Sequence, residues 1–407
     1  MLMPFGAMRG WTRAQKHVVA ASYLGWTLDA FDYFLLVFVL TDVAREFRVA
    51  VKTVTFALFF TLALRPVGAL LFGRLADRYG RRPVLMADVV LYAILAFASA
   101  FSPDLTVFLV LRALFGIAMG GEWGVGASLT METVRPESRG FVSGILQSGY
   151  ASGNLLAAVA YGLLFPLVGW RGLFMLGIFP ALLVLYIRRH VGESPGWNPE
   201  RAKAGRIADV LRRHWRLATY AILLMSAFNY LSHGTQDMYP TFLKVDHGLN
   251  PHIIAIVLVV ANIGAILGGI LFGTLSQHFG RRRTLIVGAL LCIPAIPAWL
   301  YGGGSIALAA GAFAMQFLVQ GCWGLVPAHL NELSPADARG TFPGVVYQLG
   351  NLFASYAAPL QAALAVQYGS YGFALAGVTS VAALGVAFLA SIGREAKEVD
   401  MGVAAAV

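Results

Sequence analysis

Charged residues are scarce in this chain of 407 residues, where lysine, arginine, aspartate and glutamate together make up 12%. Soluble domains contain about 25%, so too little polar surface is available here to cover a water-soluble chain of this size. Cysteine is also nearly absent, and Cys292 and Cys322 both lie inside apolar stretches, where a small packing role is expected. No disulfide framework is implied, and an ordinary soluble globule is excluded.

Long hydrophobic runs take the place of charge, since 58% of the residues are hydrophobic. A helix needs about 20 mostly apolar residues to cross a bilayer, and such runs recur from one end of the chain to the other. We therefore predict an all-α membrane protein with twelve transmembrane helices. The predicted spans are residues 18–40, 53–73, 83–101, 105–130, 140–165, 170–188, 217–240, 251–276, 284–301, 305–330, 341–366 and 371–392.

Two blocks of sequence recur at an offset of 200 residues. Residues 71–82 and 271–282 share seven of twelve positions, and residues 121–140 align with 321–340 in the same register. Two separate blocks at one offset indicate duplication of a six-helix unit, a construction common in transporters, whose substrate sites lie where the halves meet. The expected divisions are an N-terminal six-helix bundle over 1–187, a cytoplasmic linker over 188–216 and a C-terminal six-helix bundle over 217–407.

The positions of the basic residues predict that both termini lie in the cytoplasm. With this orientation, 23 of the 30 lysines and arginines fall on the inner side of the membrane and five on the outer side, as the positive-inside rule requires. The net charge of +10, which would suggest nucleic acid in a soluble protein, is thereby explained by topology, and no nucleic-acid partner is expected. Arg65 and Arg112 are the two that remain, and both lie inside spans.

Residues at the inner turns form most of a group of candidate gating residues. Glycines in the turn between the second and third spans permit tight backbone geometry, and Asp77 can pair with nearby arginines as a breakable latch. Acidic and basic residues also bracket the turns after spans four and ten, where their pairing would close the inner side. Fixed topology anchors are the alternative. The candidates are Gly73, Asp77, Arg78, Arg81, Arg82, Arg112, Glu132, Arg139, Glu332 and Arg339.

Two of these stretches resemble motifs of the major facilitator superfamily. Residues 73–83 resemble its loop signature between the second and third helices, apart from Pro83, where many members have a basic residue. Residues 112–120 resemble its fourth-helix motif, an arginine followed by spaced small residues. The resemblance covers essentially the whole chain, because the repeat and the number of spans match as well. It implies two six-helix bundles that expose a central site alternately to either side of the membrane.

Ionisable residues inside spans are rare and are functional candidates by default. Asp29 and Asp32 lie midway along the first span on one helix face, and two adjacent carboxylates do not readily both ionise in a low dielectric. One of them is therefore a proton-carrier candidate, with Arg65 or Arg112 as the counter-charge. A static ion pair that orients the helices is the alternative. Asp88, near the inner end of the third span, is interpreted as a latch partner.

Among these candidates, Arg65 gives the most information about the substrate. It is followed by Pro66, which loosens the helix and frees a carbonyl. Arginine stays charged in proteins, and its planar guanidinium matches the geometry of a carboxylate. An arginine near the middle of the membrane therefore predicts an anionic substrate that carries a carboxylate.

The seventh span carries a stripe of polar residues. Asn229, His233 and Asp237 are four residues apart and so share one helix face. A face this polar would not contact lipid, so we expect it to line a cavity. His233, with Asp237 one turn away, is a candidate proton relay.

The same stretch resembles a signature of the sialate:proton symporter group within that superfamily, above all its lactate and pyruvate permeases. The signature is Asn-x-x-Ser/Thr-His-x-Ser/Thr-Gln-Asp-x-x-x-Thr, and all seven specified positions match in residues 229–241. The Gln and Asn of the group's eleventh helix correspond to Gln348 and Asn351, three residues apart on one face. Segment 188–216 is shorter than the middle of the sialate carriers, which favours small monocarboxylates.

Together these patterns predict proton-coupled symport of a small monocarboxylate such as lactate or pyruvate. Symport of another organic anion (a sialate, an aromatic acid or a dicarboxylate) and a receptor or sensor with a transporter fold are the alternatives. No HExxH pair, nucleophile elbow or phosphate-cradling loop is found in the sequence, so we expect neither an enzyme nor a cofactor or metal. The expected partners are a small organic anion, a proton and the bilayer of the inner or plasma membrane, with the protein acting as a monomer. The substrate-binding candidates are Arg65, Asn229, His233, Gln348 and Asn351, and the proton-coupling candidates are Asp29, Asp32, His233 and Asp237.

Overall fold

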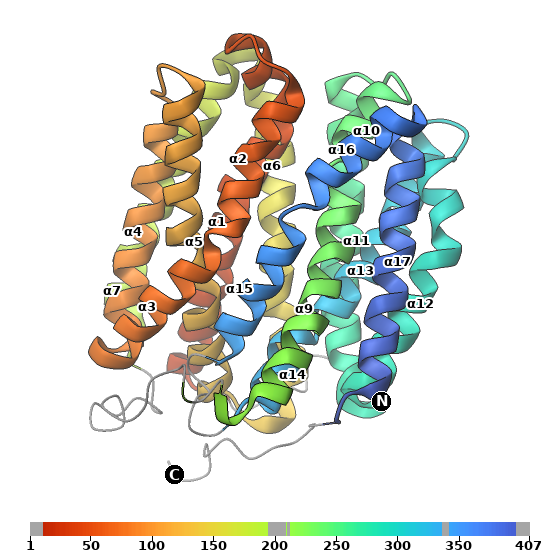
Figure 1. The fold of residues 1–407 in the computed structure, drawn as a ribbon. Helices are drawn as coiled ribbons and strands as arrows, with labels where there is room; N and C mark the ends of the chain where they lie inside the picture. The colour runs from red at the N-terminus through yellow and green to blue at the C-terminus, as the bar shows by residue number, and fades with distance from the viewer. Residues whose placement is uncertain (1–10, 194–208, 210–211, 336–341, 396–407) are drawn as a thin grey trace.

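The regular elements are all helices in the residues that the computed structural model describes, which are 11–193, 209, 212–335 and 342–395 (Figure 1). The side chains of Asp77 and Pro136 also lie outside the described part. The first group of elements is α1 (Arg13–Glu46), α2 (Val51–Ala63), α3 (Arg65–Tyr79), α4 (Arg81–Ser99), α5 (Leu105–Thr133), η2 (Pro136–Ser138), α6 (Arg139–Met175), η3 (Leu176–Leu182) and α7 (Leu183–His190). The second group is α9 (Trp215–Gln236), α10 (Tyr239–Val245), α11 (Pro251–Phe279), α12 (Arg281–Leu300), α13 (Ser305–Trp323), α14 (Val326–Leu333), α15 (Phe342–Ala354), α16 (Ala357–Tyr368) and α17 (Tyr371–Ile392).

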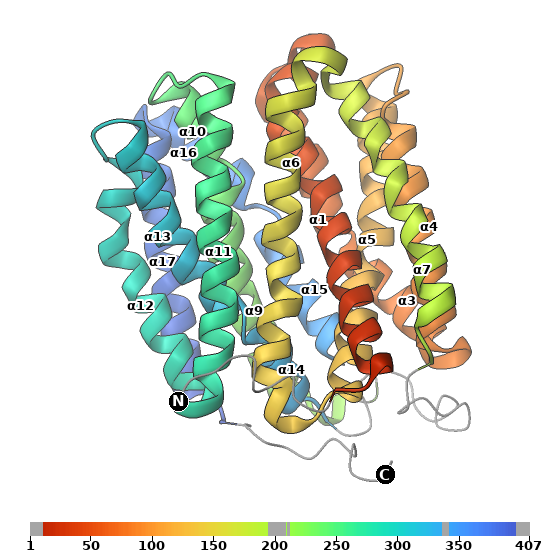
Figure 2. The ribbon, with the colours of Figure 1, turned by 180° about the vertical axis from the view of Figure 1, so that it is seen from behind.

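The two groups of helices stand side by side, α1–α7 in one and α9–α17 in the other (Figures 1 and 2). Helices α1, α4, α6 and α12 each begin with an arginine, and all four begin at the same end of the molecule (Figure 1). We call this end, marked by Arg13, Arg81, Arg139 and Arg281, the basic end. Most of the predicted linker, residues 194–208 and 210–211, lies outside the described residues.

Ten helical segments in the described residues are long and apolar enough to cross a membrane, which makes the chain a multi-pass membrane protein. The difference from the twelve predicted spans has two causes. The fifth and sixth predicted spans lie in one segment of 52 residues, Arg139–His190, which would be about 78 Å long if straight. It turns at Gly169, where φ is 64°. The seventh predicted span is α9, which is too polar along one face to count among the ten.

Four helical spans are interrupted part-way along, and a proline follows each interruption. Pro66 follows the break between α2 and α3, and Pro240 follows that between α9 and α10. Pro327 and Pro359 stand in the same relation to the breaks before α14 and α16. Proline lacks an N–H, and its ring clashes with the carbonyl four residues earlier, so the helix breaks on its N-terminal side. Such breaks free backbone groups that can line a binding site.

Glycines of α6 and α11 bring the two groups into close contact toward the basic end. A Cβ atom on Gly144 would lie 2.6 Å from the carbonyl oxygen of Gly269, and one on Gly140 would lie 2.7 Å from that of Gly273. Backbone atoms cannot move aside as a flexible side chain can, so a larger residue at either position would force the helices apart. The two groups are therefore closed against each other at this end.

Candidate transport site

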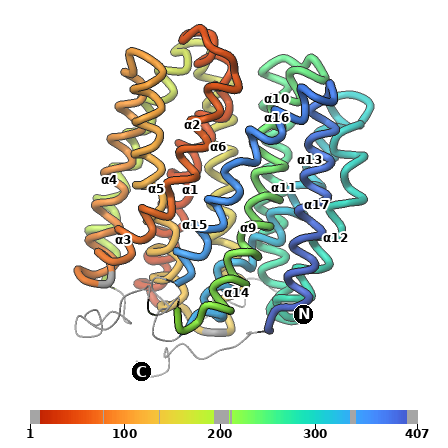
Figure 3. The backbone as a smooth tube through the Cα atoms, in the orientation of Figure 1, coloured from red at the N-terminus to blue at the C-terminus, as the bar shows by residue number. Residues whose placement is uncertain are grey.

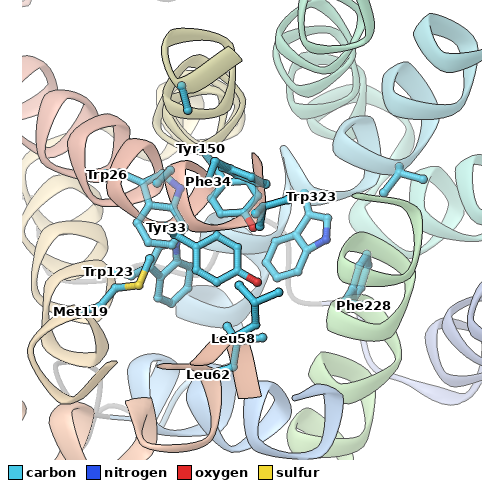
Figure 4. Close-up of a cluster of buried hydrophobic side chains, with 14 of the residues drawn as sticks. Trp26, Tyr33, Phe34, Leu58, Leu62, Met119, Trp123, Tyr150, Phe228 and Trp323 are labelled. Carbon is cyan, nitrogen blue, oxygen red and sulfur yellow. The ribbon is translucent and has the colours of Figure 1, made fainter. Parts of the chain in front are cut away.

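Many of the residues singled out from the sequence lie at the interface between the two groups of helices. Helix α15 packs against α9 of its own group and against α3 of the other (Figure 3). Aromatic side chains from both groups gather in this region, where Tyr33 and Trp123 lie opposite Phe228 and Trp323 (Figure 4). These rings supply rigid apolar walls with polar edges around the interface.

Arg65 is the first residue of α3 and lies directly after the break in the helix. It is 1% exposed, its guanidinium carbon lies 5.6 Å from the centre of the Tyr33 ring, and Nη2 donates to Met119 Sδ. Among the described residues no carboxylate lies within the 4.0 Å of an ion pair, and its Nε has no hydrogen-bond partner. Buried charges are normally paired, and a guanidinium without an ion-pair partner can form two parallel hydrogen bonds with a carboxylate.

Polar groups from both sides of the interface surround Arg65. Tyr347 of the second group and Tyr150 of the first each interact electrostatically with it. Tyr150 Oη and Asn351 Oδ1 are buried and have no hydrogen-bond partner among the described residues. Because buried polar atoms are nearly always hydrogen-bonded, a ligand with several oxygen atoms would complete this arrangement.

Gln348 and Asn351 lie against each other on α15. Asn351 Nδ2 donates to Gln348 Oε1 at 2.6 Å, and Gln348 Nε2 donates to the carbonyl oxygen of Gly120 on α5 at 3.4 Å. Both side chains are fully buried. The two amides therefore join the groups across the interface.

His233 and Asp237 form a hydrogen-bonded pair that reaches the other group through Tyr33. His233 Nδ1 lies 3.1 Å from Asp237 Oδ2, and Tyr33 Oη donates to the same oxygen at 3.2 Å. The ring centres of Tyr33 and His233 are 5.9 Å apart, and all three residues are buried. Gain or loss of a proton at His233 or Asp237 would therefore change a contact that spans the interface.

Asn229 is buried on the same face of α9 as His233, but its amide group is already occupied. Its Nδ2 donates at 2.8 Å to a backbone carbonyl one turn earlier in α9, so its Oδ1 is the atom that can meet a ligand. The polar residues beside the stripe hold α9 against α13, with Gln236 Nε2 donating to Gln316 Oε1 at 2.8 Å. The polarity of this span thus serves packing within the second group as well as the interface.

Asp29 and Asp32 are fully buried, and no carboxylate oxygen of either has a hydrogen-bond partner among the described residues. Asp29 interacts electrostatically with Arg65, and Asp32 interacts with Arg112. The two counter-charges expected from the sequence are therefore divided between the two acids. Neither contact is within the 4.0 Å of an ion pair, so the static pair considered as an alternative is not formed here.

Arg112 lies apart from the turns with which it was grouped as a gating residue. Its Nη2 donates to Ser99 Oγ at 2.6 Å, and its guanidinium carbon lies 4.4 Å from the ring centre of Phe115 and 4.9 Å from that of Phe174. Ser99 is the last residue of α4, far from the basic end where α4 begins. Arg112, expected from the sequence inside the fourth span, thus holds α4 against α5 near the opposite end.

Two ion pairs at the basic end repeat at the offset of 200 residues. Arg81 Nη2 lies 3.7 Å from Glu132 Oε1, and Arg281 Nη2 lies 2.9 Å from Glu332 Oε1. Arg139, also buried, opens α6 beside them. Each ion pair joins helices of one group, and Arg281 also lies against α6 of the other group, where a Cβ atom on Gly140 would come 3.0 Å from its Nη1. The gating role expected for these acids stays a prediction.

The other gating candidates make local contacts. Arg82 Nη2 donates to the carbonyl oxygen of Arg188 at 2.5 Å, the guanidinium carbon of Arg78 lies 5.2 Å from the ring centre of Tyr79, and Gly73 lies inside α3. The tight turn expected here is made by a neighbouring glycine at position 80, whose φ is 102°. Two further candidates, Arg339 and the side chain of Asp77, lie outside the described residues.

A small cavity lies beside the polar stripe, between α1, α6, α9, α11 and α13. Its volume is about 10 Å³, which is room for about one water molecule. An organic acid is several times larger and does not fit in this cavity in the described conformation. The cavity is lined by Phe34, Val37, Phe38, Asn154, Thr235, Gln236, Tyr239, Pro240, Leu258, Ala261, Asn262 and Gln316.

A match to a family model identifies the family to which this chain belongs. The model described as Major Facilitator Superfamily matches residues 22–236 and residues 222–401, nearly the whole chain. The chain belongs to the Major Facilitator Superfamily. As a member of this superfamily it is a multi-pass membrane transporter and not an enzyme.

Similar proteins within the superfamily include transporters named for organic acids. The "Carboxylic acid transporter protein homolog" of Saccharomyces cerevisiae (strain ATCC 204508 / S288c) is 30% identical over 394 residues, which cover 90% of this chain. This chain spans 64% of the length of that yeast protein. The sialic acid transporter NanX of Escherichia coli (strain K12) is 26% identical over 372 residues, covering 90% of this chain and 91% of NanX.

Solved structures of superfamily members share the fold. The proton:xylose symporter XylE, bound to 6-bromo-6-deoxy-D-glucose, has a TM-score of 0.73 at 20% identity, covering 94% of this chain and 97% of that chain. The human organic anion transporter MFSD10 has a TM-score of 0.72 at 16% identity, covering 91% and 99%. At these identities the likeness concerns the fold alone.

Sequence reasoning missed the aromatic and sulfur groups around Arg65 in this superfamily member. Met119, Tyr150 and Tyr347 lie in apolar spans, where such residues are typical of ordinary packing, and nothing in their spacing marks them. Tyr33 did carry a signal, because it follows Asp29 by four residues and so lies on the same helix face. A search for polar side chains one turn from each buried charge would have found it.

Proposed function

We propose that this transporter is a proton-coupled symporter of a small organic anion, with a monocarboxylate of the lactate and pyruvate class as its substrate. The observation that carries the proposal is Arg65, a buried guanidinium at the interface with no carboxylate in ion-pair contact among the described residues. The carboxylate of the substrate would supply the missing charge through two parallel hydrogen bonds. One arginine suits one carboxylate better than two.

Polar groups on both sides of the interface would orient the bound anion. Tyr150 Oη can donate or accept a hydrogen bond, and Asn351 Oδ1 can accept one from a hydroxyl group. Gln348 is hydrogen-bonded to Asn351 and would move with it. His233 and Asn229 face the same region from α9 and are the further substrate-binding candidates.

The names of similar proteins support an organic acid as the substrate class. One is a carboxylic acid transporter homolog and another is a sialic acid transporter. Because of the second similarity, sialate is the second candidate.

Coupling to protons would use the buried acids of α1 and the pair of His233 and Asp237. When Asp29 carries a proton, Arg65, with which it interacts electrostatically, faces less negative charge and binds the substrate anion more strongly. Proton and substrate then favour each other's binding, because such coupling is reciprocal. The two would cross the membrane together.

Transport would proceed by alternating access, with two six-helix bundles rocking about the site. We infer that these bundles are residues 1–187 and 217–407, joined by a cytoplasmic linker over 188–216. We also infer that the basic end faces the cytoplasm, since basic residues accumulate on that side. The described conformation, closed at the basic end by α6 and α11, is then one whose site has no access to the cytoplasm. We propose that one chain acts as a monomer in the inner or plasma membrane.

Uptake of labelled lactate into proteoliposomes tests the proposal. We expect an inward proton gradient to drive accumulation and a protonophore to abolish it. Unlabelled pyruvate should compete, and sialate and a dicarboxylate included as competitors would rank the alternatives. Lactate accumulation that ignores the proton gradient would contradict the coupling, and absence of transport for every small carboxylic acid would contradict the substrate class.

Replacing Asp237 with asparagine should weaken coupling more than substrate binding. Asparagine has the same shape but carries no charge, so the contact with His233 and Tyr33 no longer responds to gain or loss of a proton at position 237. We expect gradient-driven uptake to fall about tenfold or more, with a smaller change in equilibrium affinity for lactate. Asp104→Asn is the matched control, because asparagine caps a helix as well as aspartate does. Unchanged gradient-driven uptake in Asp237→Asn would remove Asp237 from the coupling machinery.

A further inference from the structure

The first group of helices buries more negative than positive charge in its interior. Away from the basic end, four carboxylates and two guanidiniums lie there, and each of these residues is at most 1% exposed, whereas the equally buried Arg139 opens α6 at the basic end itself. Among the described residues none of these opposite charges forms an ion pair with another. The residues are Asp29, Asp32, Asp88, Glu122, Arg65 and Arg112.

Glu122 of α5 occupies the space left by the missing side chain of Gly25 on α1. A Cβ atom on Gly25 would lie 2.4 Å from Glu122 Oε1, and one on Gly126 would lie 3.8 Å from the same oxygen. Gly25 precedes Asp29 by one helical turn, so the Glu122 carboxylate lies against α1 one turn from Asp29. Its Oε2 has no hydrogen-bond partner among the described residues.

Helix α4 brings a third carboxylate and a phenol to the same region. Asp88 interacts electrostatically with Glu122 and Asp29, and its Oδ1 has no hydrogen-bond partner among the described residues. Tyr92, one turn further along, is 0% exposed, and its Oη likewise has no partner in this part of the chain. Tyr92 interacts with all four carboxylates. Its hydroxyl group is therefore directed into the cluster of acids.

These carboxylates are arranged by depth between the basic end and Arg65. Helices α1, α4 and α5 each have one end at the same level of the molecule. Gln15 of α1 donates to the carbonyl oxygen of Thr133 at the end of α5, and Arg81 at the start of α4 contacts Glu132 of α5. With a rise of 1.5 Å per residue, Asp88 lies about 10 Å from this level, Glu122 about 16 Å and Asp29 about 21 Å. The acids therefore form a series that leads from the basic end to the site.

We propose that Glu122 and Asp88 are proton-binding groups that carry the coupled proton between Asp29 and the basic end. The path runs inside the first group of helices and is separate from the substrate's path between the two groups. The proposal rests on the proposed function, because it assigns the route of the proton in that symport. In each step one carboxylic acid loses a proton and the next carboxylate binds it, and no other bond changes. Tyr92 Oη can donate and accept at once and so bridge two of the acids.

Protons are the occupants that this cluster fits best. An isolated ionised carboxylate is very costly to bury, and two guanidiniums cannot neutralise four of them, so the excess acids hold protons. Within the described residues no three His, Cys, Asp or Glu side chains are placed to hold a metal ion together. The groups that face Glu122 are Asp29 from α1, Arg65 from α3, and Asp88 and Tyr92 from α4.

The variant Glu122→Gln separates proton movement from substrate movement. Counterflow exchanges labelled for unlabelled lactate without net proton transfer, whereas accumulation against a gradient requires the proton to cross. We expect the variant to keep counterflow near the wild-type rate while its gradient-driven accumulation falls about tenfold or more. Glu122→Asp, which restores a carboxyl group, should recover accumulation. Glu137→Gln, at an exposed glutamate beside the basic end, is the matched control and should behave as wild type.

Several outcomes would overturn the inference. Wild-type accumulation in Glu122→Gln would show that the proton does not use Glu122. Loss of counterflow together with accumulation, with no recovery in Glu122→Asp, would indicate a structural role. Should Glu122→Gln fail to fold, Asp88→Asn gives the same two readouts with the same interpretation. If wild-type protein ignores a proton gradient, or responds to a sodium gradient instead, the proposed function fails first, which distinguishes the two failures.

Discussion

Replacing Arg65 with glutamine should abolish lactate uptake. Glutamine keeps hydrogen-bonding capacity but removes the charge, and the buried carboxylate of the substrate is left without a counter-charge. Truncating one partner of a buried, hydrogen-bonded charge pair costs about 2–5 kcal/mol, which corresponds to about 30-fold to several-thousand-fold in affinity. Uptake kinetics and equilibrium binding of lactate in the purified protein measure the loss directly.

Substitutions of Arg65 that keep or remove its charge distinguish a binding role from a structural one. Arg65→Lys keeps the charge but loses the planar fork, so we expect intermediate affinity. Arg74→Gln, at an exposed arginine of the same helix, is the matched control and should transport normally. Near-normal kinetics in Arg65→Gln would remove Arg65 from the site, and a misfolded Arg65→Lys protein would point to structure instead of binding.

Replacing Gly144 with valine should prevent closure at the basic end and stop transport. The new Cβ would lie 2.6 Å from the carbonyl oxygen of Gly269, a backbone atom that cannot rotate away. Overpacking of this kind costs about 1–3 kcal/mol, which lowers the population of the closed state about 5- to 150-fold. A transporter that cannot close one end cannot complete its cycle, so turnover should fall by a similar factor while lactate still binds.

Distances between spin labels report the expected opening. Labels at Arg135 and His278, both exposed near the basic end of different groups, should lie further apart in Gly144→Val than in wild type. The measurement requires Cys292 and Cys322, both buried, to be replaced by alanine. Gly377→Val is the matched control, since a Cβ there meets nothing within 4 Å. Unchanged label distances with normal turnover would show that α6 and α11 tolerate the added bulk.

Much of the fold could be predicted because membrane spans are long apolar runs. The length of each run and the offset of 200 residues indicate two groups of helices without any knowledge of contacts. The segments that are long and apolar enough to cross a membrane are ten in the described residues, fewer than the twelve predicted spans, for two reasons. The turn at Gly169 joins two spans without a charged loop, and the polar face of α9 lowers its apolar character. The prolines that follow the four helix breaks were visible, but only Pro66 was interpreted as loosening a helix.

The candidate site could be predicted in part, because an ionisable residue stands out in an apolar span. Arg65, Asp29 and the stripe that contains His233 were found in this way. Their partners were not, because Tyr150 and Tyr347 look like ordinary packing residues in sequence. Asp88 was interpreted as a latch partner and Glu122 lies within the fourth predicted span, but their distance from Asp29 along the chain hid that they lie near it in space.

The sequence by itself determined the class of molecule: low charge and long apolar runs require a membrane protein, and residues that cannot face lipid must line its interior. Only the tertiary structure decided which of those residues meet. Helical periodicity relates residues within one turn of each other along a chain, whereas Arg65, Tyr150 and Tyr347 come from three helices in two groups. Their proximity arises from packing between helices, to which glycines such as Gly144 and Gly269 contribute by allowing close backbone contact. For the same reason, the scarcity of charge identified the candidates, while the packing determined that Arg65 lacks an ion-pair partner among the described residues.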